Sequence, residues 1–337
     1  MRNKPLKYCL ITGMLLYLFL CAVRFISAKP LWLDENFILS NIRELSPPEI
    51  FGPLKHAQGF PRVYLFLIQG CARAFSYNIY SLRMLPFACM ISSFFIWLSI
   101  YKREEGKGIG FLLFILSWCG SYFMSNYSSE LKQYSMDVLA AAIFSWFILR
   151  QKYFLSAQKI MLSLQAGYLL LPSLVLLSYT GYFFVLLPAY NLILNLKGNK
   201  PNKAYLSVYT ASLIVCIFLS YHFDLRYTLA DQGLRGYWKD YFISTSSVYE
   251  FVKSFTEGLR NIFVRWFLER KPVTYIMTIF MPLGLFYMFF SVFKRIKGDK
   301  AAILSLGGLA LVLLMELFLA GMMKVYPFTG ARVTLFM

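Results

Sequence analysis

Charged residues are scarce in this sequence, and their scarcity excludes an ordinary soluble domain. Asp, Glu, Lys and Arg make up 15% of the 337 residues, whereas a soluble domain of this length carries roughly 25%. Hydrophobic residues account for 58% of the chain, and aromatic residues alone for 19%. This composition predicts an integral membrane protein whose helices pack in lipid and end in aromatic belts.

Acidic residues are especially few, with 16 Asp and Glu against 34 Lys and Arg, so the formal net charge is +18. The basic residues fall mainly in short runs between apolar segments, which is the pattern of membrane topology signals. The same excess can also indicate nucleic-acid binding, but that function favours a continuous basic face. We therefore expect membrane lipid, and no nucleic acid, as a partner.

Cysteine motifs are missing as well. The six cysteines lie far apart and mostly inside apolar runs, with no CxxC pair and no Cys/His spacing typical of a metal site. Neither a zinc site nor a disulfide framework is therefore expected. No soluble domain, low-complexity tract or internal repeat interrupts the pattern, so we expect a single membrane domain over 1–337.

Long apolar runs, in contrast, are abundant. A perpendicular transmembrane helix needs about 20 residues, and several runs approach that length. The first run follows a basic N-terminus, and its length favours a retained helix over a cleaved signal peptide. Together the runs predict an all-α polytopic bundle of about nine spans, at residues 8–27, 84–101, 108–124, 134–149, 160–177, 180–195, 204–222, 273–292 and 301–321.

The basic segments between the runs predict one orientation. With a cytoplasmic N-terminus, all five fall on the cytoplasmic side, as the positive-inside rule requires. The outer face then carries two long segments, 28–83 and 223–272. Long connections in a compact protein are typically functional elements. The five basic segments are 1–7, 102–107, 150–159, 196–203 and 293–300.

The first outer segment predicts two amphipathic helices. Residues 35–45 place their apolar side chains near one helical face, and residues 61–76 form an apolar stretch that begins with Pro61. If 61–76 spanned the membrane, the basic segment that follows would move to the outer side. We therefore expect it to be an interfacial helix lying against the bilayer.

Two adjacent carboxylates, Asp34 and Glu35, follow the first apolar run. Carboxylates at the outer end of a helix are costly in lipid but tolerated in a water-filled cavity. Partial desolvation raises the basicity of such a group, which suits a general base or a metal ligand. The alternative is structural, with Asp34 as the N-cap of the helix that follows.

A second polar cluster occupies the turn at 125–137, where Glu130, Lys132 and Tyr134 reach the same outer face. A lysine near carboxylates can bind a phosphate, or it can simply neutralise its neighbours. Both interpretations stay open at this point.

A third cluster lies in residues 54–64, with Lys55, His56 and Arg62 at the start of the expected interfacial helix. Three such side chains together suit an anionic headgroup. The alternative for His56 is an ordinary hydrogen-bonded surface residue.

Two more stretches reach the outer face. Arg332 follows the last apolar run, and an arginine there either snorkels to the interface or binds an anionic headgroup. Residues 223–242 mix carboxylates with Tyr and Trp. Rings beside carboxylates suit a sugar site, but the same composition describes an aromatic belt.

Six motifs follow one another in a characteristic order. Trp32, Asp34 and Glu35 form a W-x-D-E motif, and Arg83 and Pro86 lie in SLRMLPF. The other four motifs are GFPRVY, ELKQY, SYTGYF and YPFTGAR. In kind and order they resemble the motifs of the polytopic GT-C glycosyltransferases that use polyprenyl-phosphate-linked sugars, a group that includes protein mannosyltransferases and the aminoarabinose transferase of lipid A.

The resemblance implies a GT-C-like helix bundle that performs inverting glycosyl transfer. The donor is a polyprenyl-phosphate sugar, and the acceptor is a hydroxyl group of a glycan, lipid or protein. Asp34 is then the general base, while Glu35 and Glu130 orient the acceptor, or a divalent metal ion is held by Asp34 and Glu130. The remaining expected contacts to the donor phosphate or substrate are Lys55, His56, Arg62, Lys132, Tyr134 and Arg332.

The resemblance also implies a location and a size. It predicts the inner membrane of a bacterium, with the N-terminus in the cytoplasm and the active site on the outer face. Many family members carry later helices and a C-terminal domain that have no counterpart here, so a shortened member is expected.

Two other functions compete with glycosyl transfer. A transporter or flippase for a lipid-linked glycan is expected to carry charged residues at mid-membrane and repeat symmetry. Arg24 and Glu316 are the main charged residues inside the expected spans, and no repeat is visible. A catalytically inactive assembly subunit is the other alternative, because of the short C-terminal part.

Overall fold

The computed structural model describes residues 4–104, 109–156, 162–194, 200–263, 271–296 and 303–328. Within these ranges all regular elements are helices, which confirms the all-α prediction. The five longest helices are α1 (Lys4–Ile26), α4 (Ile79–Glu104), α7 (Tyr134–Ser156), α12 (Lys200–Ser220) and α16 (Lys271–Ile296).

The remaining helices are shorter and connect or cover the long ones. They are α2 (Leu33–Glu44), η1 (Glu49–Phe51), α3 (Arg62–Ala74), α5 (Ile109–Gly120), α6 (Tyr122–Asn126), η2 (Tyr127–Ser129), α8 (Leu162–Leu170), η3 (Leu171–Ser173), α9 (Leu174–Leu177), α10 (Gly181–Phe184), α11 (Leu186–Leu194), η4 (Tyr221–Leu225), α13 (Arg226–Ala230), α14 (Gln232–Trp238), η5 (Lys239–Tyr241), α15 (Val248–Phe263) and α17 (Leu306–Met322).

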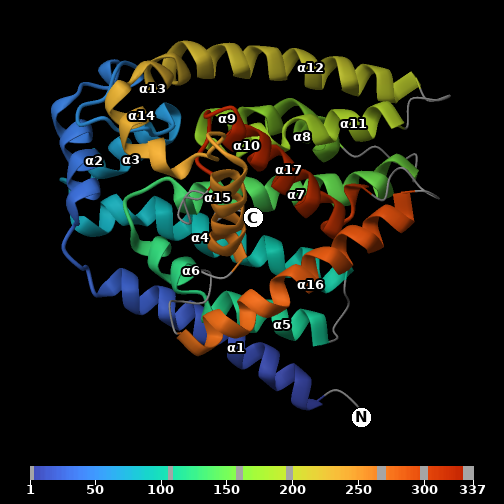
Figure 1. Cartoon of the computed structure of the whole chain (residues 1–337). Helices are drawn as coiled ribbons and strands as arrows, with labels where there is room; N and C mark the ends of the chain where they lie inside the picture. Colours follow the sequence, from blue (N-terminus) through green and yellow to red (C-terminus); the bar gives the residue numbers. More distant parts are fainter. Residues whose placement is uncertain are drawn as a thin grey trace.

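The long helices α4 and α7 pack along each other at the centre of the bundle. α1 packs against α5 and α4, and α12 packs against α8, α9 and α11 (Figure 1). The main core is aliphatic and aromatic, with fully buried side chains such as Phe144 and Phe184. α3 of the first outer segment packs against α4, so α4 links this segment to the centre of the bundle.

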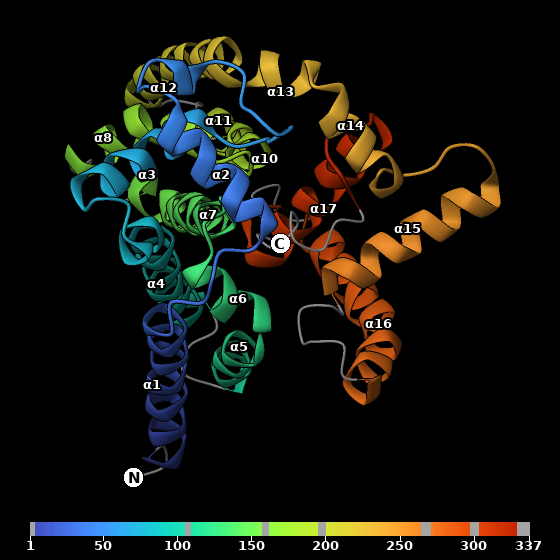
Figure 2. The same cartoon turned by 90° about the vertical axis from the view of Figure 1, so that its left-hand side faces the viewer.

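The bundle has two distinct ends. α2, α3, α13 and α14 gather at one end, which we call the loop end; Figure 2 views the molecule from that side. The N-terminus of α1 and the C-terminus of α4 lie at the opposite end (Figure 1), where Lys102 and Arg103 close α4. We call this the basic end. The separation agrees with the predicted sidedness, while the orientation in a membrane stays a prediction.

Three helices are long and apolar enough to cross a membrane. They cover Tyr8–Ile26, Ile79–Arg103 and Lys203–Ala230, and they match the expected runs 8–27, 84–101 and 204–222. The third runs past residue 222 through the π-helical turn η4 into α13. The second outer segment therefore begins later than the expected residue 223. The total of about nine spans stays a prediction.

Two of the expected spans are broken in the structure. The run 160–177 is divided into α8, η3 and α9, and η3 contains Pro172. A proline cannot donate the hydrogen bond that a continuous helix needs, so the helix changes pitch there. The run 180–195 is divided at Val185 into α10 and α11. Hydropathy alone does not register these breaks, because the interrupting residues are themselves apolar.

The first outer segment folds into the two helices expected from its sequence. α2 buries Ile38 and Ile42, and α3 buries Leu65 and Ile68. Each such side chain contributes roughly 1.5–3 kcal/mol when buried. α2 packs on α3, and α3 packs against α4 and α9. With 13 residues, α3 is about 20 Å long, which is too short to span a bilayer.

Candidate functional site

The start of α2 determines the roles of the two adjacent carboxylates. The helix begins at Leu33, and its N-cap is Trp32 rather than Asp34. The capping carboxylate is Glu35, whose Oε2 accepts a hydrogen bond from the backbone N–H of Trp32 at 3.1 Å. The expectation that Asp34 is the N-cap was therefore wrong, because a residue three positions inside the helix satisfies the free N–H.

Glu35 is buried and fully engaged. Its Oε1 accepts from the backbone N–H of Leu131 at 2.6 Å, and Arg83 Nη2 lies 3.7 Å from its Oε2. Burial raises the pKa of Glu35, against the opposing effect of the N–H donors of Leu131 and Trp32 and of Arg83. The Glu35 side chain is 1% exposed. Its contacts connect the start of α2 to the turn before α7.

Asp34 is the open member of the pair. Its side chain is 33% exposed, and its Oδ2 lies 3.7 Å from Nζ of Lys132, whose side chain is 7% exposed. Lys132 Nζ also donates to Gln58 Oε1 at 3.0 Å. Three segments far apart in the sequence thus converge on one ammonium group. We call Asp34, Gln58 and Lys132 the polar triad.

The loop that supplies Gln58 has an unusual backbone. His56 and Ala57 both have positive φ, at 63° and 49°, a conformation that side-chain-bearing residues adopt at an energetic cost. The exposed His56 ring stacks on Phe37 with centroids 4.6 Å apart. Gln133 Nε2 lies 3.5 Å from the carbonyl oxygen of Gly59. These contacts hold Gln58 toward Lys132.

Lys55 is directed elsewhere. Its Nζ pairs with Glu44 Oε2 at 2.5 Å, with both side chains about half exposed. The hydrogen bond from Lys55 lowers the pKa of Glu44. Asn41 fixes the backbone of Lys55 by accepting from its N–H at 2.8 Å. The Lys55 ammonium group therefore pairs with the last residue of α2 and is not part of the polar triad.

Arg62 belongs to a second, closed polar centre. Its Nη1 donates to the carbonyl oxygen of Phe60 at 2.7 Å and lies 3.7 Å from Asp224 Oδ1. Asp224 also accepts from Tyr179 at 3.0 Å and Thr228 at 2.9 Å. Both members of the pair are at most 5% exposed. We call these residues the closed centre; it joins α3 to η4.

The other expected contacts lie close to the polar triad or outside the described residues. Glu130 is partly buried and ends η2, and Tyr134 is 6% exposed with its ring 4.8 Å from that of Tyr127. Glu130 and Tyr134 each lie two residues from Lys132, so they flank this member of the polar triad in sequence. Arg332 falls outside the described residues, and its expected role has no structural counterpart here.

The described residues do not fit a resident metal ion. Over the ranges given above, no group of three or more His, Cys, Asp and Glu side chains is placed to hold one. Asp34, an expected ligand, faces an ammonium group rather than a second carboxylate. A metal ion therefore takes no part in the chemistry derived below.

Sequence reasoning missed Gln58 of the polar triad and two other buried polar residues, Arg83 and Asp137. Gln58 lay inside the stretch 54–64 with no feature that marked it as a partner of Lys132. Arg83 lay in the motif SLRMLPF, but no contact was assigned to it. Asp137 lay at the edge of the second cluster, and it accepts from Ser178 Oγ at 2.5 Å. An acidic residue in an otherwise apolar run was the only local signal that pointed to Asp137.

The described residues define the class of the protein as all-helical, with three helices long and apolar enough to cross a membrane. Comparisons with models of protein families, with curated proteins and with solved structures found no match.

Proposed function

We propose that this chain is a membrane glycosyltransferase that moves a sugar from a polyprenyl-phosphate donor to an acceptor hydroxyl at the outer membrane face. The observation that carries the proposal is the pair of Asp34 and Lys132. A partly exposed carboxylate lies 3.7 Å from a buried ammonium group, which matches the base and the phosphate-binding cation that such a transfer requires.

The reaction assigns Asp34 the role of general base. The acceptor oxygen forms a bond to the anomeric carbon while its proton passes to the Asp34 carboxylate. On the opposite face of the sugar, the bond between the anomeric carbon and the phosphate oxygen breaks. The electron pair leaves with the lipid phosphate, and the configuration at the anomeric carbon is inverted.

The leaving phosphate requires a fixed positive charge. Lys132 offers a compact ammonium group that binds phosphate as a point charge, and Gln58 holds it by accepting one of its hydrogen bonds. Preorganised charges near the leaving group act most strongly where water is excluded. The low exposure of Lys132 supports this role.

Glu35 acts as a positioning residue in this scheme. Its contacts to Trp32, Leu131 and Arg83 fix the start of α2 against the turn that carries Lys132. Because Asp34 is the residue immediately before it, the same contacts fix the starting positions of base and cation. The 3.7 Å contact between them opens when the donor sugar enters, since the base and the leaving phosphate lie on opposite sides of the anomeric carbon. Loss of Glu35 is expected to disturb geometry and not chemistry.

The test is a transfer assay with purified protein in detergent and a set of polyprenyl-phosphate sugars. Release of lipid phosphate and appearance of glycosylated acceptor are measured for the wild type, Asp34→Asn and Glu257→Gln. Glu257 is the control, because it is an exposed carboxylate of α15 in the second outer segment, outside the stretch 223–242. We expect transfer by the wild type and the control, and transfer slower by about 10²–10⁴-fold in Asp34→Asn. Full activity of Asp34→Asn contradicts the base assignment.

Transport of a lipid-linked glycan is the second candidate, and one observation favours it. Asp137 lies within α7 at 3% exposure, and buried carboxylates inside membrane helix bundles typically mark ion or substrate pathways. A flippase moves a labelled donor between leaflets of a vesicle without consuming it. An inactive assembly subunit neither moves nor consumes the donor, so the assays separate all three functions.

A further inference from the structure

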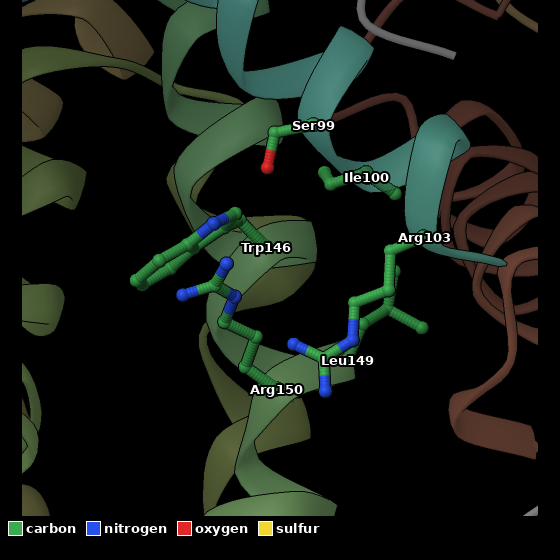
Figure 3. A pocket seen from close by; sticks show the side chains of 6 residues that line it. All are labelled: Ser99, Ile100, Arg103, Trp146, Leu149 and Arg150. Carbon is green, nitrogen blue, oxygen red and sulfur yellow. The ribbon is translucent and has the colours of Figure 1, made fainter. Parts of the chain in front are cut away.

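The pocket between the last turns of α4 and α7, drawn in Figure 3, has room for about one water molecule. A group as large as a phosphate or a sugar does not fit there. A more extensive apolar surface lies on α15, in the second outer segment of the chain.

One side of α15 packs against α17. The Phe251 and Phe255 rings lie 6.3 and 5.4 Å from the ring of Phe318, edge to face. Phe255 also stacks on Phe328, with centroids 5.9 Å apart, and Ile262 is buried in the same cluster. The α15 members of this cluster recur at intervals of four and seven residues, which places them on one side of the helix.

The neighbouring side of α15 is apolar and exposed. Val248, Tyr249 and Val252 are 82%, 73% and 50% exposed, and we call them the open strip. At about 100° per residue, the two valines lie between the buried side and the exposed charged residues Lys253 and Glu257. The apolar face of α15 is therefore wider than the part that α17 covers, and in water this excess is unfavourable.

The segment before α15 carries further exposed aromatic side chains. Tyr237 and Tyr241 are exposed, and both rings contact Trp238, with centroids 5.0 and 5.2 Å apart. The backbone N–H of Ser244 donates to Ser254 Oγ at 3.0 Å, which joins this segment to α15. Tyr and Trp are the residues enriched where a membrane meets water.

The position of α15 along α17 favours the bilayer as the cover of the open strip. Phe318 lies four residues before the end of α17, and Ile243, which precedes α15, packs beside Gly321 in the last turn. α17 makes up most of the expected span 301–321, so α15 lies where that span leaves the hydrocarbon core.

The direction of α15 agrees with this depth. It lies across the direction of α7, which runs sideways in Figure 1 and is seen nearly end-on in Figure 2. A helix perpendicular to the central helices of a membrane bundle is parallel to the bilayer plane. Amphipathic helices at that level lie with their apolar side in the lipid.

The extent of the apolar surface favours lipid over a second copy of the chain. A stable interface between proteins takes about 20–30 residues a side, whereas the open strip has three side chains. The apolar surface also continues on the helix that α15 crosses, where Met315, Leu319 and Met323 are exposed. A continuous apolar surface around the end of an expected span is typical of lipid contact.

We propose that α15 lies in the interface of the membrane leaflet at the loop end, with the open strip inserted among the lipid chains and Tyr237 and Tyr241 at headgroup level. Burial of apolar side chains makes this contact, so it does not require anionic lipid. It is independent of the glycosyl transfer proposed above.

The test measures the depth of spin labels by electron paramagnetic resonance, on the full chain in phosphatidylcholine vesicles. Labels are attached to Tyr249→Cys and Val252→Cys in the open strip, and to Lys253→Cys and Glu257→Cys as controls on the polar side of the same helix. Collisions with oxygen, which concentrates in the bilayer, are compared with collisions with a water-soluble nickel chelate. The signal from the native cysteines of the unsubstituted chain is subtracted.

We expect the two labels of the open strip to lie about 5–10 Å inside the headgroup boundary and the two control labels to lie outside it. Four labels in water overturn the proposal. Labels of the open strip that meet neither reagent also overturn it: they assign the strip to a contact between copies if they broaden each other's spectra, and to a cover from the same chain if they do not.

Two further measurements keep the test decisive. Vesicles that also contain phosphatidylglycerol are expected to give the same depths, and insertion seen only with this anionic lipid overturns the apolar contact. Tyr249→Trp keeps an aromatic ring at the exposed position if the cysteine variants do not fold. Brominated phosphatidylcholine is expected to quench the added fluorescence more strongly than iodide in the water does, and the reverse order overturns the proposal.

Discussion

Asp34 and Asp224 each lie 3.7 Å from a cation at the loop end of the bundle, yet their surroundings differ. Asp34 is 33% exposed and faces Lys132. Asp224 is 5% exposed and faces Arg62, with two hydroxyl groups donating to it. Distance alone does not distinguish the two pairs; exposure and hydrogen bonding do.

The ion pair of the closed centre is almost inaccessible from outside the protein. Burying an ion pair costs desolvation energy that is recovered only when the remaining donors and acceptors are satisfied, and Asp224 meets that requirement. The polar triad leaves part of Asp34 accessible, so a substrate hydroxyl can reach it. This contrast leads to the following predictions, from the largest expected effect to the smallest.

Asp34→Asn is expected to lower the rate of sugar transfer by about 10²–10⁴-fold, the usual contribution of a general base. The amide has the shape of the carboxylate but does not accept the proton. The loss of thermal stability is expected to be smaller than in Arg62→Leu, because Lys132 loses a partly exposed counter-charge but keeps its hydrogen bond to Gln58. A large loss of stability in this variant places Asp34 with the closed centre instead.

Arg62→Leu is expected to destabilise the fold by about 3 to 5 kcal/mol, because it leaves the Asp224 carboxylate buried without its cation. Unfolding is followed by circular dichroism in detergent. The double variant Arg62→Leu/Asp224→Leu is expected to recover part of the loss, since no charge then remains buried. If the double variant is less stable than Arg62→Leu, the ion pair does not explain the effect.

Lys132→Ala is expected to lower the rate of transfer by about 10²–10³-fold, in line with the loss of one preorganised group that stabilises charge. Lys55→Ala serves as the comparison, because Lys55 pairs with Glu44 outside the polar triad. It is expected to leave the rate unchanged. Equal effects of the two substitutions refute the assignment of Lys132 as the specific cation.

The smallest expected effect concerns the ionisation of Glu35, which makes the free energy of unfolding depend on pH. Burial raises the pKa of this group in the folded chain, so the folded state holds its proton more strongly than the unfolded state. The free energy of unfolding is then expected to fall as the pH rises above about 4.3, the value of a free Glu, and to level off beyond the raised pKa.

The measurement compares unfolding temperatures between about pH 4 and 7 for the wild type, Glu35→Gln and Glu257→Gln. Glu257 is an exposed residue of α15 and serves as the control. Glu35→Gln is expected to reduce the slope, and the control to keep it. An unchanged slope in Glu35→Gln assigns the pH dependence to other groups.

Much of the helical framework was predictable because its signal is local. The apolar run after the basic N-terminus became α1, and the runs at 84–101 and 204–222 became parts of α4 and α12. The break of the run 160–177 at Pro172 has a local signal, the proline, which hydropathy alone does not register. The extension of α12 through η4 into α13 has no such signal in the apolar pattern.

The candidate site was predictable in part. The sequence placed Asp34, Glu35 and Lys132 among the candidates, and the structure brings all three together. It did not distinguish the open Asp34 from the buried Glu35, although they are neighbours. Consecutive residues on a helix point in directions about 100° apart, so the Asp34 carboxylate is partly exposed while the Glu35 carboxylate faces the core.

The sequence by itself determined that the chain is helical and largely apolar, with basic segments separated from two long polar segments. These properties follow from transfer free energies and backbone hydrogen bonding, which act within a few residues. Only the tertiary structure decided which cation meets which carboxylate. Leu131 donates to Glu35 across 96 residues, and such a contact depends on how α2, α3 and the turn before α7 pack, because no local pattern encodes the distance between them.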